Sequence, residues 1–166
     1  MMKLKVEQAL NLQIDREAYS SHLYLSMAVW AESQGYSGTS KWLYAQALEE
    51  RNHLVLFIQY VNGRGGKVII PLINQPPQEW ESVQSLFNQV LEHERFITDS
   101  INEIVAICSA EKDFTTLNWL QFFVNEQIEE ENSVKAIIDN LKLLGNNNMY
   151  LFDRDVFAMR TQASVQ

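Results

Sequence analysis

Glycine and proline occur in only three short windows of this chain, and that distribution is the strongest constraint on its fold. The windows are Gly35 with Gly38, the stretch from Gly63 to Pro77, and Gly145. An all-β sandwich or barrel needs a turn signal about every 8 to 12 residues. Because the segments between the windows run far longer than that, the sequence excludes an all-β fold and predicts an all-α one.

The uninterrupted segments predict four long helices and one short helix. The segment from 78 to 144 is too long for one globular helix, and the polar run 109–116 is suited to end one helix and cap the next. We therefore expect helices near 5–34, 40–62, 82–110 and 115–144, and a short one near 148–160 after Gly145. A chain of 166 residues buries about 70% of its unfolded surface, so we expect a single domain over 1–166.

The lengths of the links predict how these helices are connected. The link 34–39 is short, which favours antiparallel neighbours. The link 63–81 can extend roughly 60 Å, more than the roughly 38 Å of a 25-residue helix, so the second and third helices can run parallel. The expected architecture is a four-helix bundle with a long crossover. Its apolar strip Val68–Ile73 is expected to form a subunit interface.

Charge and composition limit which classes of partner the chain can bind and in which compartment we expect it. The chain has 21 acidic and 13 basic residues and a net charge of −8, so it repels nucleic acid and anionic membranes and favours cations. The longest apolar run, 68–73, is too short to cross a bilayer, and the N-terminus does not read as a secretory signal. Cys108 is the only cysteine and forms no internal disulfide. We therefore expect a cytoplasmic protein.

Each long helix carries an acidic residue on the stripe that should face the bundle interior. Steps of three and four residues trace these stripes. The third helix reads Val83, Phe87, Val90, Glu94, Ile97, Ile101, Ile104 and Cys108. The same stepping places Glu17 in the first stripe, Glu50 in the second, and Gln127 and Glu130 in the fourth. His53 follows Glu50 by three residues, on the same helix face.

Four inward carboxylates predict a dinuclear metal site. An unpaired buried carboxylate costs several kcal/mol, and no Arg or Lys occupies these stripes. Protonation of the carboxyl groups is the alternative solution. Two divalent cations would neutralise the four charges, and His53 adds a nitrogen ligand. Carboxylate oxygens with one imidazole favour iron or manganese, although the ligand set also permits Zn²⁺ or Co²⁺.

The residues around this site carry a family resemblance over essentially the whole chain. They are Glu17 with Tyr24, Glu49-Glu50-Arg51-Asn52-His53, His93-Glu94, Glu126-Gln127-Ile128-Glu129-Glu130, and the final helix from Met149-Tyr150-Leu151. In these motifs and their spacing the chain resembles bacterial non-haem ferritins. The resemblance implies a ferritin-like bundle, a homo-oligomeric hollow shell of 24 subunits, oxidation of Fe²⁺ by O₂ or H₂O₂, and storage of ferric oxide mineral.

The same resemblance implies roles for individual residues. One iron would bind Glu17, Glu50 and His53, and a second would bind Glu50, Glu94 and Glu130, with Gln127 beside the pair. A third iron would be lined by Glu49, Glu126, Glu129 and Glu130. Tyr24 would hydrogen-bond a ligand or supply an electron. The implied cofactor is therefore iron, two ions per subunit and a third site.

Some positions depart from the pattern of the relatives. Many have Trp where this chain has Phe122 and His where it has Ile128, so no role of those side chains carries over. Haem-binding relatives use a Met next to the metal motif, where this chain has Asn52. We therefore expect no haem.

Two other functions are compatible with a helical bundle. A di-iron peroxidase or oxygenase of the rubrerythrin type would use the same fold, but rubrerythrins add a cysteine-bound iron domain, which one cysteine cannot build. Their relatives also usually carry a second Glu-x-x-His motif where this chain has residues 127–130. A metal-free structural bundle is the remaining alternative, and it leaves the inward carboxylates unexplained.

Overall fold

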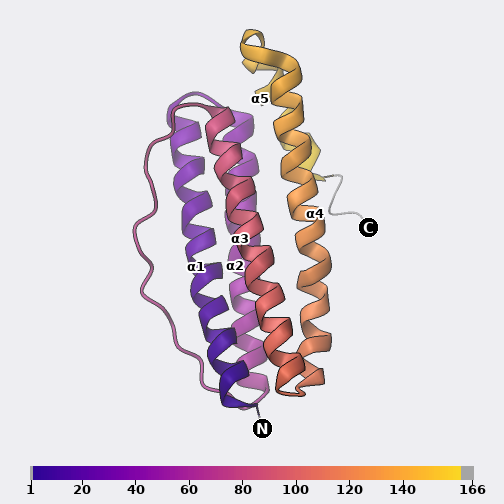
Figure 1. The fold of residues 1–166 in the computed structure, drawn as a ribbon. Coiled ribbons are helices and arrows are strands. Elements are labelled where there is room, and N and C mark those ends of the chain that lie inside the picture. Colours follow the sequence, from indigo (N-terminus) through magenta and orange to yellow (C-terminus); the bar gives the residue numbers. More distant parts are fainter. Residues whose placement is uncertain (1, 162–166) are drawn as a thin grey trace.

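The computed structural model describes residues 2–161, and all regular structure in that range is helical (Figure 1). The helices are α1 (Leu4–Ser33), α2 (Ser37–Gly63), α3 (Val83–Ala110), α4 (Phe114–Leu144) and α5 (Met149–Thr161), with a 3₁₀ turn, Gly145–Asn147, before α5. Four long helices and one short helix confirm the predicted fold class.

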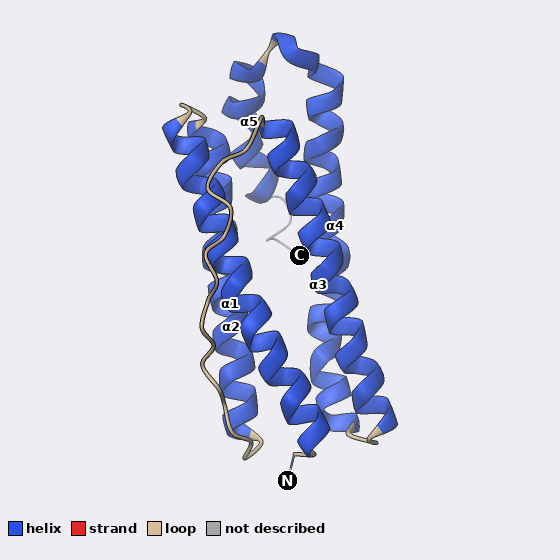
Figure 2. Cartoon of the chain, turned by 60° about the vertical axis from the view of Figure 1, so that its left-hand side comes forward, coloured by secondary structure: helices blue, strands red, loops and turns tan. Residues whose placement is uncertain are grey.

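The crossover between α2 and α3 runs along the whole length of the bundle beside α1 (Figures 1 and 2). Side chains of α1 hold it at both ends. Near the start of α1, Asn11 Oδ1 accepts the Ile69 N–H at 2.7 Å, and near its end the Ser26 hydroxyl donates to the Pro77 carbonyl at 2.6 Å. Because the crossover returns the chain to the opposite end of the bundle, α2 and α3 run parallel, and each forms an antiparallel pair with its sequence neighbour.

The turn between α3 and α4 forms without glycine or proline. Lys112 adopts a left-handed conformation with φ 57°, a backbone region that non-glycine residues seldom occupy. Asp113 then caps α4, because its side chain accepts the Thr116 N–H at 3.1 Å. The polar run predicted to break this long segment therefore contains the cap.

α2 begins at Ser37, three residues before the predicted start, and the reason lies in α5. The Asp153 carboxylate of α5 accepts the N–H groups of Gly38 at 2.9 Å and Thr39 at 2.8 Å. These two groups would otherwise lack partners at a helix N-terminus. The approach requires glycine, because a Cβ on Gly38 would lie 1.7 Å from the Asp153 carbonyl oxygen.

The interior consists of two apolar clusters with a polar layer between them. The cluster at one end includes Trp42 and Phe87, and α5 adds Phe152 and Val156 to it. The cluster at the other end is built mainly from aliphatic side chains and contains the buried Cys108. Within the described range, no helix has both the length and the apolar content needed to cross a membrane.

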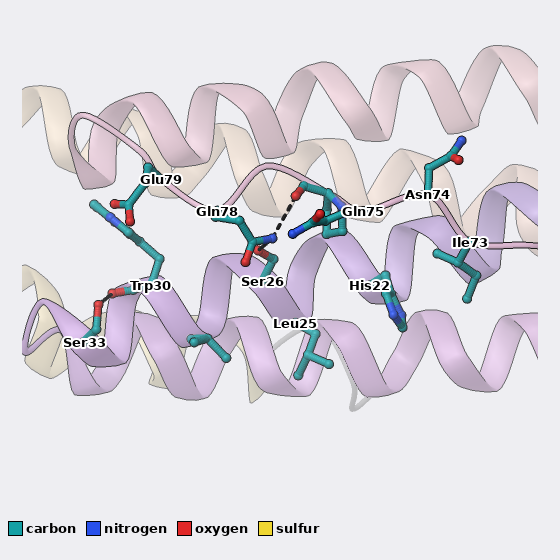
Figure 3. A pocket seen from close by; sticks show the side chains of 12 residues that line it. His22, Leu25, Ser26, Trp30, Ser33, Ile73, Asn74, Gln75, Gln78 and Glu79 are labelled. Atoms are coloured by element: carbon teal, nitrogen blue, oxygen red, sulfur yellow. Dashed lines mark hydrogen bonds between the residues drawn. The ribbon is translucent and has the colours of Figure 1, made fainter.

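The outer face of α1 and the crossover expose apolar side chains. Ile69, Ile70 and Leu72 of the crossover are 60%, 71% and 89% exposed. Next to them, α1 and the crossover enclose an open pocket of about 640 Å³, lined on the α1 side by His22, Leu25 and Trp30 among others (Figure 3). This face is separate from the polar layer inside the bundle.

Candidate metal centre

Each of the four long helices contributes one buried carboxylate to the polar layer. They are Glu17 of α1, Glu50 of α2, Glu94 of α3 and Glu130 of α4. His53 and Gln127 are buried with them. The inward stripes therefore place these side chains at one level of the bundle, between the two apolar clusters.

Glu17, Glu50 and His53 form the tightest group in this layer. One ligand atom from each lies within 4.8 Å of the others. His53 Nδ1 is 3.3 Å from Glu50 Oε2 and 4.0 Å from Glu17 Oε2. Glu17 Oε2 is buried and has no hydrogen-bond partner. A buried carboxylate oxygen without a donor is costly, and a cation between these three side chains would satisfy it.

Glu94 is held from two sides. The Tyr24 hydroxyl donates to Glu94 Oε1, and Gln127 Nε2 donates to Glu94 Oε2 at 3.1 Å. Burial and the neighbouring Glu94 charge raise the pKa of Tyr24 well above its ordinary value, so its hydroxyl remains a proton donor at neutral pH. Tyr24 and Gln127 therefore both lie against the centre, as the family resemblance implies.

A second group lies on the outer side of His53. His53 Nε2 is 3.1 Å from Glu126 Oε2, and Glu49, His53 and Glu126 offer ligand atoms within 4.8 Å of one another. Glu49 also forms an ion pair with Arg160 of α5. Glu129 is exposed. Of the four side chains expected to line a third site, the structure thus places Glu49 and Glu126 beside His53, Glu129 on the exposed side of α4, and Glu130 in the buried layer.

The pKa values of three buried acids and of His53 are raised when no cation is present. Burial, and then the charge of Glu50, raises the pKa of Glu94 to about 8. The same two causes raise the pKa of Glu17 well above its ordinary value, and burial with the Glu94 charge does so for Glu130. Burial alone would lower the pKa of His53, but hydrogen bonding to Glu126 and Glu50 outweighs it and raises this pKa to about 12.

Glu50 behaves in the opposite way. Burial alone would raise its pKa, but the hydrogen bond and the positive charge of His53 hold it below the ordinary value. Glu50 and His53 therefore form the charged pair at the middle of the centre. The raised pKa values of Glu94, Glu17 and Glu130 favour protonation, the alternative that the sequence left open, at these three carboxyl groups when no cation is present.

Two glutamines and one arginine belong to the centre although the sequence analysis did not identify them. Gln13 Nε2 donates to Glu17 Oε1 at 2.6 Å, and Gln46 Nε2 donates to both Glu50 Oε1 and Glu130 Oε2 at 3.1 Å. Gln13 and Gln46 each precede a stripe glutamate by four residues, which is one helical turn and a usable sequence signal. No comparable signal exists for Arg160, because it reaches the centre only through the return of α5.

The donor set fits divalent cations that prefer oxygen and nitrogen ligands. Across residues 2–161, no Lys or Arg nitrogen lies within 4.0 Å of the carboxylates of Glu17, Glu50, Glu94 or Glu130. Apart from His53, which pairs with Glu50, no basic side chain among the described residues is therefore in contact to neutralise their negative charge. Carboxylates with one imidazole match iron and manganese well, and converging carboxylates from four helices are the known arrangement of dinuclear sites in such bundles.

Comparisons with known proteins agree with this description. Residues 7–144 match the family model described as a ferritin-like domain. The chain is 38% identical to a probable bacterial non-heme ferritin-like protein of Haemophilus influenzae, over 98% of this chain and 100% of that protein. It is 39% identical to a bacterial non-heme ferritin of Campylobacter jejuni, over 93% of each. Among solved structures, an open pore ferritin from Archaeoglobus fulgidus superposes with a TM-score of 0.91 at 40% identity, covering 94% of this chain and 96% of that one.

Proposed function

This chain belongs to the ferritin family, and on that premise we propose that it is an iron-storage protein with a ferroxidase centre inside each subunit. Its substrate is Fe²⁺, its oxidant is O₂ or H₂O₂, and its product is a ferric oxide mineral. The mineral would be held in a hollow homo-oligomeric shell of 24 subunits. The observation that carries this proposal is that four buried carboxylates, one from each long helix, share one layer with His53 and contact no lysine or arginine among residues 2–161.

We assign the ligands from the geometry and the family pattern together. One Fe²⁺ binds Glu17, Glu50 and His53, and the second binds Glu50, Glu94 and Glu130. Glu50 bridges them, which accords with its position between His53 and the Gln46 amide. Glu49 and Glu126, with Glu129 further out, form an outer position through which iron leaves the pair.

The chemistry follows from holding two reductants side by side. Each Fe²⁺ gives up one electron, and two electrons with two protons convert O₂ to H₂O₂. The surrounding residues keep the ligands in place during this change. Tyr24 and Gln127 hold Glu94, Gln13 holds Glu17, and Gln46 holds Glu50 and Glu130.

The same observations bear on the compartment of the protein and on the alternative function. A single buried free cysteine fits a reducing cytoplasm, which we propose as the location. A rubrerythrin-like peroxidase or oxygenase is not favoured, because the relatives that match nearly the full length are ferritins.

Stepwise addition of Fe²⁺ in air tests the proposal. Oxygen consumption, iron bound per particle and particle size are measured on the same sample. A storage protein forms a large particle and continues to oxidise and retain iron well beyond its ligand sets, whereas an oxygenase saturates near about two irons per chain. A metal-free bundle consumes no oxygen and retains no iron.

The Glu94→Gln variant links the activity to the centre. It removes one ligand charge with little change in shape, so iron oxidation should slow by an order of magnitude or more. The matched control is Glu92→Gln, an exposed glutamate two residues away on the same helix. Equal oxidation rates in the two variants would refute the assignment of the centre.

A further inference from the structure

The last turn of α5 delivers an arginine to the outer edge of the metal centre. The Arg160 side chain is 15% exposed. Its Nη2 pairs with Glu49 Oε2, its Nη1 donates to Gln46 Oε1, and its guanidinium lies 5.5 Å from the centre of the Trp42 ring. All three partners belong to α2. Arg160 therefore joins the C-terminal helix to the helix that carries Glu50 and His53.

Through Gln46 this contact extends to two of the inner carboxylates. A glutamine side chain has one accepting and one donating end. Arg160 occupies the accepting end, which directs the NH₂ group toward Glu50 and Glu130, each 3.1 Å from Gln46 Nε2. Arg160 thereby orients an amide that holds two ligands, although it touches neither of them.

Through Glu49 the same guanidinium occupies a side chain of the outer group. Glu49, His53 and Glu126 offer ligand atoms within 4.8 Å of one another, so a cation could bind among them. Arg160 already satisfies Glu49 with a charge-assisted hydrogen bond, the strong kind. A cation and Arg160 both carry positive charge, so each weakens the binding of the other to the Glu49 carboxylate.

We propose that Arg160 is a positioning residue with two opposite effects: it supports the inner cation pair through Gln46, and it competes with cations for Glu49 at the outer position. The inference rests on the proposed function and deepens it. Coupling between two binding events is reciprocal. A cation that binds Glu49 therefore releases the last turn of α5 from α2, and docking of that turn lowers the affinity of the outer position for cations. The end of α5 would then respond to iron passing outward.

Anaerobic titration of the intact, assembled protein with Co²⁺ tests the first half of this inference. Arg160→Gln should strengthen the weakest binding class by roughly tenfold and weaken the tight class by a few-fold. Arg160→Lys keeps the positive charge beside Glu49 but loses the two-pronged geometry of the guanidinium. Its cation affinities in both classes should lie between those of the wild-type protein and those of Arg160→Gln. The matched control is Arg154→Gln, which removes the same charge from an exposed position on α5, where Arg154 pairs with Asp155. A merely structural role of Arg160 would shift both classes in the same direction, and that result would overturn the proposal.

Hydrogen exchange tests the second half. In the wild-type protein, amides of residues 156–160 should exchange faster once Co²⁺ fills the weak class, and should not respond while only the tight class is filled. Glu49→Gln, which removes both the ion pair and the outer ligand, should abolish this response. If α5 exchange is insensitive to saturation, the competition is refuted while tight binding of about two cations per chain still supports the ferroxidase centre. If the wild-type protein has no tight class at all, the proposed function fails and this inference fails with it.

Discussion

Neutral amides, rather than lysine or arginine side chains, orient the carboxylates of the candidate metal centre within residues 2–161. Three glutamines each donate to at least one inner carboxylate: Gln13 to Glu17, Gln46 to Glu50 and Glu130, and Gln127 to Glu94. An amide fixes the direction of a carboxylate without cancelling its charge, whereas an arginine would do both. The centre is therefore oriented and still attractive to cations.

Cation binding should release protons from this centre. At pH 7 Glu94, with a pKa of about 8, is mostly protonated, and His53, with a pKa of about 12, also holds a proton. Burial raises the pKa of Glu17 and Glu130 in the same direction. Ligands must lose their protons to bind metal. Titration with Zn²⁺ in weakly buffered solution should thus acidify the sample, and Glu94→Gln should release roughly one proton fewer per chain. Release equal to that of the wild-type protein would contradict the protonated state of Glu94.

The same pKa shift fixes how stability depends on pH when no cation is bound. The folded state retains a proton on Glu94 up to about pH 8, whereas the ordinary pKa is 4.5. The folded state therefore binds more protons than the unfolded state between these values, and stability falls as pH rises through that window. The lowered pKa of Glu50 acts only below the window.

Thermal unfolding of chelator-treated protein measures this slope. The wild-type midpoint should fall by several °C between pH 5 and pH 8. Glu94→Gln, which cannot ionise, should show a smaller fall, and Glu92→Gln should keep the wild-type slope. A midpoint that rises over this range would show that the buried carboxyls are already ionised in the folded state.

At the scale of elements, α5 packs against the first half of α2 and completes one apolar cluster of the bundle. Phe152 and Val156 complete an apolar cluster that also contains Trp42 of α2, and Asp153 caps the start of α2. A helix of 13 residues is too short to be stable alone. Its stability therefore comes from this docking, and α2 gains its first turn in return.

Removing the cap should loosen both helices. In Asp153→Ala the N–H groups of Gly38 and Thr39 lose their acceptor, which costs about 1 kcal/mol for a typical cap. Hydrogen exchange in the first turn of α2 and in α5 should accelerate by roughly fivefold. Asp155→Ala is the control, because Asp155 is exposed and pairs only with its neighbour Arg154 among the described residues. Equal protection in the two variants would show that the cap contributes nothing to docking.

At the scale of the whole molecule, the crossover exposes apolar side chains whose contact with water is unfavourable for an isolated subunit. Ile69, Ile70 and Leu72 expose most of their apolar area. Ile73, the next residue of the crossover, lines the open pocket between α1 and the crossover (Figure 3). Contiguous apolar surface of this kind is typical of contacts between subunits. This agrees with the proposed assembly into a shell.

Leu72→Glu tests the assembly role of this surface. A charge at a position that becomes buried between subunits costs several kcal/mol, and a shell repeats that cost in every copy. The variant should elute as small oligomers in size-exclusion chromatography with light scattering, with helix content unchanged by circular dichroism. Leu72→Met preserves apolar character and should elute as the wild-type protein does. Shells of normal size in Leu72→Glu would place the interface elsewhere.

The sequence predicted the elements that depend on local signals. The helices follow from the absence of glycine and proline, and Glu17, Glu50, Glu94 and Glu130 stand out because each interrupts an apolar stripe. Regular spacing on a helix determines which side chains face inward, so the inner carboxylates could be grouped before any coordinates were known.

What the sequence could not predict depends on how distant segments meet. The early start of α2 is set by Asp153, which lies 114 residues away from Thr39 in the chain. Arg160 reaches Gln46 and Glu49 for the same reason. Glu129 belongs to an acidic run, yet only the rotation of α4 decides that it is exposed while Glu130 is buried.

Under the proposed function, which produces peroxide, the position of Cys108 has a further consequence. Peroxide attacks the thiolate form of cysteine. Burial, and then the charge of Asp113, raises the pKa of Cys108 to about 11, so about one molecule in ten thousand carries a thiolate at pH 7. The only sulfhydryl of the chain would thereby be shielded from the oxidant that the proposed centre makes a few turns away along the same bundle, and repeated turnover would leave it reduced.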